Sequence, residues 1–104
     1  VIVIGAGGIF TELIRETKTL LLPLTKNDIQ NELKNMKIGK ILFGYRNQDR
    51  ADIDSLIKTI LSLSKFAEKN INKLHEIEIN PLIVCKKNKG VFAVDALIHY
   101  FEEL

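Results

Sequence analysis

The stretch 76–95 constrains the fold more than any other part of this sequence. Two runs of alternating apolar residues flank the polar segment Lys87–Gly90, and this pattern predicts an antiparallel hairpin with a tight turn. A turn centred on the second and third residues of that segment places Leu82 opposite Asp95. A three-residue loop at 88–90 with a bulge shifts the pairing by one residue instead. The hairpin is predicted in both cases, and its register depends on the turn.

The first of these registers gathers oxygen-bearing side chains on one face of the hairpin. Side chains alternate between the two faces of a strand, so Asn80 shares a face with Leu82 and Asp95. Asn80 and Asp95 are then diagonal neighbours, about 7–8 Å apart, with Glu76 and Glu78 on the same face. Carboxylate and amide oxygens suit Mg²⁺ held against phosphates. A solvated row of acidic side chains is the simpler alternative, and spacing alone does not decide between the two.

The opposite face of the hairpin is apolar and is expected to pack on the core. It comprises Ile77, Ile79, Ile83, Cys85, Phe92 and Val94. Its expected packing partner is a helix that runs from Asp52, the predicted N-cap, to about Lys69. From Ile53 onward, apolar residues of this segment recur at helical spacing and form a broad stripe.

A second helix is predicted after a short strand at 19–22. Thr25 is its predicted N-cap, and Asp28 completes a capping box three residues later. Gly39 is the expected C-terminal stop. The buried face of this helix is a narrow stripe of Ile29, Leu33 and Met36.

The glycine-rich amino-terminal segment has two interpretations. Residues 1–8 combine an apolar strand with a glycine turn, as in a dinucleotide-binding fold. Against that, Phe10 occupies the position of the third glycine, and residues 9–16 alternate as a strand does. In the strand interpretation, Gly7 and Gly8 form either a plain turn or a site of close backbone approach.

Length and composition describe one small domain, 1–104, in which 46% of the residues are hydrophobic and 27% are charged. A net charge of +2 without a basic run gives no sign of a nucleic-acid or membrane partner. The single cysteine excludes an internal disulfide. No signal peptide or membrane-spanning run is visible, so a cytoplasmic location is expected. The chain begins with Val inside an apolar strand, which predicts a fragment of a longer protein.

Four motifs in combination resemble the NDP-forming acyl-CoA synthetases, relatives of the ADP-forming acetyl-CoA synthetases and of succinyl-CoA synthetase beta chains. They are Gly7–Phe10, Gly44–Arg46, Ala51–Asp54 and Glu78–Leu82. They follow one another in the family's order over nearly the whole chain. The resemblance implies an α+β fold, the carboxy-terminal lobe of an ATP-grasp domain, with a mixed, mostly antiparallel sheet and two main helices.

The same resemblance implies site residues and ligands. Asn80 and Asp95 match the positions that hold the magnesium ion of the nucleotide, ATP or ADP. Arg46 is the expected phosphate contact, since a guanidinium pairs well with phosphate oxygens. Gly7 and Gly8 match a strand where the backbone approaches a phosphate or the active-site loop.

The implied activity is that of an acid-thiol ligase, which couples acyl-CoA formation to cleavage of ATP to ADP and phosphate. The implied partner is a CoA-binding domain or subunit of the same enzyme. Two alternatives stay open: a non-catalytic or regulatory ATP-grasp-like region, for example fused to an acetyltransferase, and a dinucleotide-binding fragment. Neither His75 nor His99 matches the family's phosphorylated histidine.

Leu97 departs from the family pattern, which usually has Arg or Lys two residues after the metal carboxylate. A cation beside transferring phosphates stabilises developing charge, and loss of one such donor costs about 10²–10³ in rate. Either Arg46 or another domain supplies this charge, or the chemistry is impaired. The balance favours impairment, because a leucine does not bind phosphate.

We predict that the isolated chain folds but does not turn over substrate, because the matched region contains one of the two lobes that clasp ATP. The measurement is ADP formation from ATP with acetate and CoA, with the chain omitted as the control. Steady turnover above that background contradicts the lobe assignment.

Overall fold

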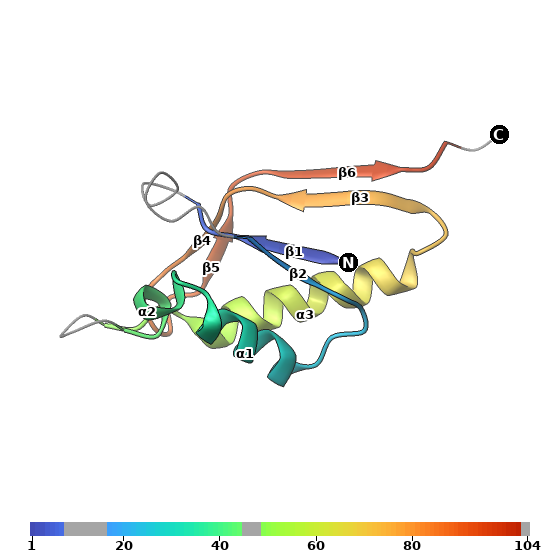
Figure 1. The fold of residues 1–104 in the computed structure, drawn as a ribbon. Coiled ribbons are helices and arrows are strands. Elements are labelled where there is room, and N and C mark those ends of the chain that lie inside the picture. The colour runs from blue at the N-terminus through green and yellow to red at the C-terminus, as the bar shows by residue number, and fades with distance from the viewer. Residues whose placement is uncertain (8–16, 45–48, 103–104) are drawn as a thin grey trace.

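The computed structural model describes residues 1–7, 17–44 and 49–102 and shows an α+β fold, as predicted (Figure 1). No helix in these ranges is long and apolar enough to cross a bilayer. In chain order the elements are β1 (Ile2–Gly5), β2 (Thr17–Leu20), α1 (Lys26–Asn35), α2 (Gly39–Leu42), α3 (Ile53–Lys69), β3 (Leu74–Ile79), β4 (Leu82–Val84), β5 (Val91–Ala93) and β6 (Ala96–Tyr100).

The described strands pair as three antiparallel ribbons, β1 with β2, β4 with β5, and β3 with β6 (Figure 1). The predicted antiparallel pairing is confirmed, while these strands form separate two-stranded sheets in place of one mixed sheet. The strand expected at 19–22 lies two residues earlier, as β2. The reason is its partner: the ladder ends where Leu20 pairs with Ile2, the first residue of β1.

Helix α1 begins at the predicted capping box. The Thr25 backbone N–H donates to Asp28 Oδ2 (2.9 Å), and the Asp28 N–H donates to Thr25 Oγ1 (3.1 Å). The helix ends at Asn35, shortly before Gly39 as expected, but its C-cap is Met36 and Gly39 begins α2. Glycine is required there by space: a Cβ atom would collide with the backbone carbonyl oxygen of Leu33 in α1.

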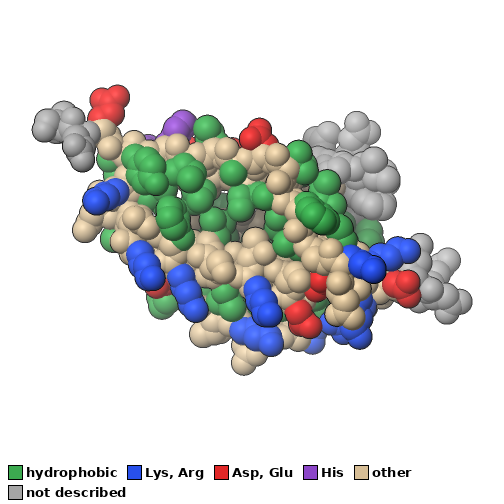
Figure 2. Space-filling model, turned by 180° about the vertical axis from the view of Figure 1, so that it is seen from behind, with side chains coloured by type: hydrophobic (Ala, Val, Ile, Leu, Met, Phe, Trp, Pro, Cys, Tyr) green, Lys and Arg blue, Asp and Glu red, His purple; other side chains and the backbone are tan. Residues whose placement is uncertain are grey.

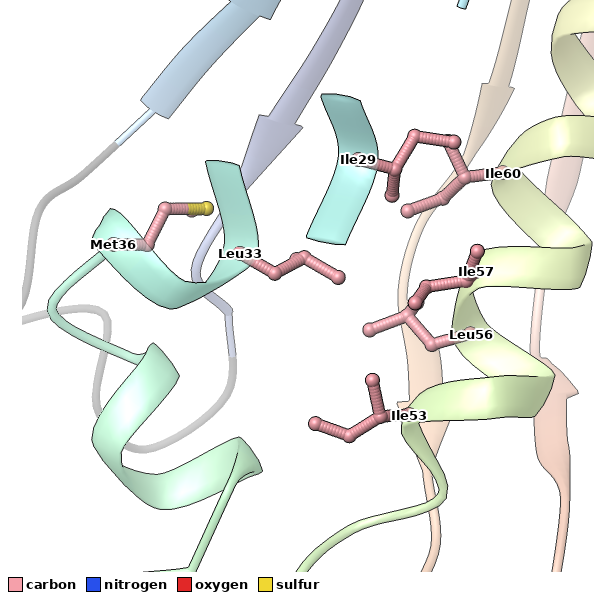
Figure 3. Packing of buried hydrophobic residues seen from close by; sticks show 7 residues of the cluster. All are labelled: Ile29, Leu33, Met36, Ile53, Leu56, Ile57 and Ile60. Atoms are coloured by element: carbon pink, nitrogen blue, oxygen red, sulfur yellow. The ribbon is translucent and has the colours of Figure 1, made fainter. Parts of the chain in front are cut away.

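The core lies between α1 and α3 (Figure 3). The predicted stripes of both helices are confirmed, and the α3 N-cap is Asp52, whose Oδ1 accepts the Ser55 N–H at 3.1 Å. The core cluster of buried apolar side chains comprises Ile29, Leu33 and Met36 from α1 and its C-cap, and Ile53, Leu56, Ile57 and Ile60 from α3. Leu20 of β2 is buried as well.

The hairpin turn lies one residue earlier than predicted. The segment Lys86–Lys89 forms the turn, with the Lys89 N–H donating to the Lys86 carbonyl (2.9 Å) and Asn88 at φ 66°. Leu82 therefore pairs with Ala93 and not with Asp95. Moving the turn by one residue moves every partner by two positions, so within β4 and β5 each residue still pairs with one from the same predicted face.

The hairpin's packing face differs from the prediction. The residues of β4 and β5 that pack against the core are Leu82, Val84 and Val91. The expected core residues Ile83 and Phe92 are 49% and 60% exposed, and Val94, just after β5, is 60% exposed. Figure 2 shows hydrophobic side chains gathered on the back of the molecule, bordered by Lys and Arg side chains.

The packing face changes where the strand is interrupted. In β3 the odd-numbered Ile77 and Ile79 are half-buried, whereas in β4 the even-numbered residues face the core. Asn80 and Pro81 separate the two strands, and proline has no N–H to donate to a ladder. The prediction extended one alternation through this break, and the alternation does not continue through it.

We predict that Leu33→Ala lowers the free energy of unfolding by about 2–5 kcal/mol, because it leaves a cavity between α1 and α3. Leu33 is 1% exposed. The measurement is urea denaturation followed by circular dichroism. The control is Leu21→Ala, since Leu21 is 74% exposed and its truncation leaves the midpoint nearly unchanged. Equal effects of the two substitutions contradict the core assignment.

Candidate functional site

The structure brings Asn80 and Asp95 directly opposite each other, where β3 gives way to β4 and β5 to β6. The Asn80 N–H donates to the Asp95 carbonyl (3.1 Å), and the Val94 N–H donates to the Pro81 carbonyl (3.1 Å). These bonds keep the β3–β6 and β4–β5 ladders in one register. The predicted diagonal placement is thus corrected to a direct cross-strand pair, which follows from the earlier turn.

Both residues line one surface pocket of about 290 Å³. Its lining comes from two segments that lie side by side, the end of β3 with Asn80 and the start of β6 with Asp95. The lining residues are Glu78, Asn80, Asp95, Ala96 and Leu97. The pocket therefore holds two carboxylates, one amide and two apolar side chains.

Neighbouring groups hold one end of each polar side chain in this pocket. Asn80 Nδ2 donates to Glu78 Oε1 at 3.4 Å, and Asp95 Oδ1 accepts the Ala96 N–H at 2.9 Å. Within the described residues, no hydrogen bond engages Asn80 Oδ1 or Asp95 Oδ2. The same holds for Glu78 Oε2, so the pocket offers these three side-chain oxygens to a ligand.

The donor set fits Mg²⁺ only in part. Oxygen ligands are what this ion prefers, and it commonly binds through one or two carboxylates together with phosphates and water. No cluster of three or more His, Cys, Asp or Glu side chains suited to a metal occurs in 1–7, 17–44 and 49–102. Asn80 and Asp95 thus offer oxygens of the kind that Mg²⁺ prefers, but fewer than its full coordination sphere requires.

The charges around the pocket are negative. Glu76, on the same face, contacts His99 through Oε2 and Nδ1 at 3.6 Å. Glu78 is paired across the ladder with Leu97, so no basic side chain faces it there. This distribution of charge favours a cation in the pocket.

The other predicted site residues stay apart from this pocket. Gly7 is exposed just after β1, and a Cβ atom there would meet nothing within 4 Å. No close contact with a described residue therefore requires glycine at this position. Gly8, Arg46 and the strand predicted at 9–16 lie outside the described residues.

Asp52 has a second role that the sequence analysis missed. Its Oδ2 accepts the Gly90 N–H at 2.7 Å, and its own N–H donates to the Cys85 carbonyl at 2.8 Å. One nearly buried carboxylate thus joins the start of α3 to the hairpin. The Gly90 N–H is the main cause that lowers the pKa of Asp52, and the Ser55 N–H lowers it further. No local pattern indicates a bond across 38 positions.

Comparison with known proteins finds similarity over nearly the whole chain. A family model described as an ATP-grasp domain matches residues 1–99. Among characterised proteins, the beta subunit of acetate–CoA ligase [ADP-forming] II from Pyrococcus furiosus is 32% identical over 97 residues. That match covers 93% of this chain and 41% of the subunit.

Two solved structures show the same fold. A crystal structure of a Pyrococcus horikoshii protein has a TM-score of 0.86 at 30% identity, and the match covers 97% of this chain and 42% of that one. Acetyl-coenzyme A synthetase 1 of Ca. Korarchaeum cryptofilum, in complex with coenzyme A and Mg-AMPPCP, has a TM-score of 0.80 at 29% identity, over 95% and 45% of the two chains. The chain spans about two fifths of the length of these three proteins. The predicted resemblance is confirmed.

We predict that Asp52→Asn lowers stability at neutral pH and flattens its dependence on acid pH. The folded pKa of Asp52 lies below its ordinary value, so its contribution is complete above the unfolded pKa and is lost as pH falls through the folded value. The measurement is the urea midpoint between about pH 7 and pH 2.

Asp54→Asn is the matched control, because Asp54 is an exposed carboxylate in the first turn of α3. Asp28, whose pKa is also lowered through its bonds with Thr25, is present in all three proteins and contributes equally. A parallel acid profile for Asp52→Asn and the unmodified chain contradicts the role of this carboxylate.

Proposed function

Because this chain belongs to the ATP-grasp domain family, we propose that it is the metal- and phosphate-holding lobe of an ADP-forming acyl-CoA synthetase. The reaction would form an acyl-CoA thioester while ATP is cleaved to ADP and phosphate. The observation that carries this proposal is the direct pairing of Asn80 with Asp95 at one pocket. The names of the Pyrococcus furiosus and Korarchaeum relatives support the reaction class.

The proposed work of this lobe is to bind and orient. Asn80 Oδ1 and Asp95 Oδ2 would hold Mg²⁺, which supplies neutralisation of phosphate charge when bound. The Ala96 N–H fixes the rotation of the Asp95 carboxylate through Oδ1. The Asp95 carbonyl, bonded to the Asn80 N–H, fixes the separation of the two backbones. The ligands therefore sit on a paired ribbon and not on a free loop.

The proposed partners are a nucleotide and a CoA-binding domain or subunit of the same enzyme. Gly7, Gly8 and Arg46 remain proposed nucleotide contacts, by their match to the family's motifs. The chain spans about two fifths of its relatives, so the complete activity is proposed for an assembly that contains the other lobe. The pocket supports this division of work between two lobes, because its lining offers side-chain oxygens to a cation and contains no basic side chain for the phosphates.

Leu97 favours a second candidate function, that of a non-catalytic or regulatory ATP-grasp-like region. It lines the pocket and is 48% exposed, at a position where the family usually has Arg or Lys. Such a site would bind a metal–nucleotide complex while lacking one donor for the developing phosphate charge. Both candidates require the cation at Asn80 and Asp95, and they differ in turnover.

We predict that Mn²⁺, an ion that oxygen donors bind as they bind Mg²⁺, binds weakly at this pocket. It should broaden the NMR signals of Asn80 and Asp95 before others. Asp95→Ala should weaken binding by at least about tenfold, since even indirect partners of a metal contribute that much. Glu68→Ala is the control, because Glu68 is an exposed carboxylate on α3. Broadening centred elsewhere, or equal effects of both substitutions, contradicts the proposed site.

A further inference from the structure

The contact between Glu78 and Asn80 determines which end of the Asn80 amide points into the pocket. Asn80 Nδ2 lies 3.4 Å from Glu78 Oε1. An ionised carboxylate only accepts hydrogen bonds, and an amide donates only through its nitrogen. Glu78 can therefore hold only the NH₂ end of the side chain, which turns the carbonyl end away from it. A cation needs that carbonyl end.

We infer that Glu78 is a positioning residue, which keeps Asn80 Oδ1 available to the cation without binding the cation itself. This inference rests on the proposed function of the pocket. Glu78 would orient the Asn80 amide in the way that the Ala96 N–H orients the Asp95 carboxylate. Each of the two proposed ligands then has one group that fixes its rotation.

No other described group competes for the Glu78 carboxylate. Its cross-strand partner is Leu97, which donates nothing from its side chain. The nearby carboxylate of Glu76 has its own contact, with His99 Nδ1. Directly opposed side chains in an antiparallel ladder lie about 4.5–5.5 Å apart at Cβ, close enough for a base at position 97 to draw Glu78 away. With leucine there, Glu78 stays with Asn80.

The same contact argues against Glu78 as a third ligand. Glu78, Asn80 and Asp95 line one pocket, and one oxygen of Glu78 is engaged by the Asn80 amide nitrogen. A carboxylate bound to the amide nitrogen acts through the amide. Partners of this kind typically contribute about 10–100-fold to metal affinity. An exposed contact of 3.4 Å belongs at the lower end of that range.

Substitutions in the whole 104-residue chain, labelled with ¹⁵N, test the role of Glu78 by the affinity for Mn²⁺. Glu78→Ala removes the acceptor and should weaken binding about tenfold. Glu78→Gln removes the charge but keeps an acceptor oxygen, so it should restore most of this loss. Glu76→Ala is the matched control, since it removes a carboxylate from the same face and leaves Asn80 untouched. Equal losses for Glu78→Ala and Glu78→Gln mean that charge alone matters, and they overturn the inference.

A double substitution separates positioning from direct ligation. Asn80→Asp has two equivalent oxygens and no NH₂ end to hold, so Glu78→Ala should no longer weaken Mn²⁺ binding in that background. An undiminished loss there shows that Glu78 binds the ion itself, and it overturns the inference. A loss that disappears supports it.

The metal-free chain gives a readout that is independent of the proposed function. The Asn80 side-chain NH₂ signals should move in Glu78→Ala, should stay close to their original positions in Glu78→Gln, and should be unaffected by Glu76→Ala. Unmoved signals in Glu78→Ala overturn the inference even where Mn²⁺ binds. Absence of any Mn²⁺ effect at Asn80 and Asp95 in the unmodified chain is the failure of the proposed function instead, and the NH₂ signals still decide the orientation.

Discussion

The rest of the structure depends on the carboxylate of Asp52. One oxygen caps α3 through the Ser55 N–H, and the other accepts the Gly90 N–H at the end of the hairpin turn. The helix carries part of the core, and the hairpin leads to the proposed metal site. This side chain therefore joins the two, together with the Asp52 N–H bond to the Cys85 carbonyl and the packing of the hairpin on the core. The Gly90 and Ser55 N–H groups lower the pKa of Asp52, because they favour the ionised carboxylate.

The two faces of the β4–β5 hairpin differ in burial, since one packs on the core and the other is exposed. Leu82, Val84 and Val91 pack on the α1–α3 core, while Ile83 and Phe92 stay exposed. Beyond the interruption at Pro81, the β3–β6 ribbon carries Glu78 and Asn80 on its exposed side. Packing thus fixes the hairpin at one end, and the polar pocket forms where the packed and unpacked parts meet.

The pocket is built to be completed by other groups. The two proposed ligand oxygens, Asn80 Oδ1 and Asp95 Oδ2, are too few for a magnesium site made of protein alone, and this ion usually retains phosphate and water ligands. In the proposed function, this chain would mainly position the cation: Ala96 and Glu78 each hold one end of a proposed ligand side chain. Leu97 provides no charge in this arrangement. Because its side chain does not compete for the Glu78 carboxylate, Glu78 keeps its contact with the Asn80 amide.

The sequence by itself determined the features that depend on neighbours a few positions apart. The capping box at Thr25, the N-cap at Asp52 and the apolar stripes of α1 and α3 follow from helical spacing, and all are present. The resemblance in motifs identified the family. The shared face of Asn80 and Asp95 followed from strand alternation, whichever even-numbered turn joined the strands.

Only the tertiary structure decided the features that depend on distant residues. The turn at Lys86–Lys89 moved the register and made Asn80 and Asp95 direct partners, which spacing alone did not show. The core selected the opposite face of the hairpin after the break at Pro81. Asp52 met Gly90 because folding brought residues 38 positions apart within hydrogen-bond distance. Local patterns specify which faces a segment has, and packing decides which face is buried and what each side chain meets.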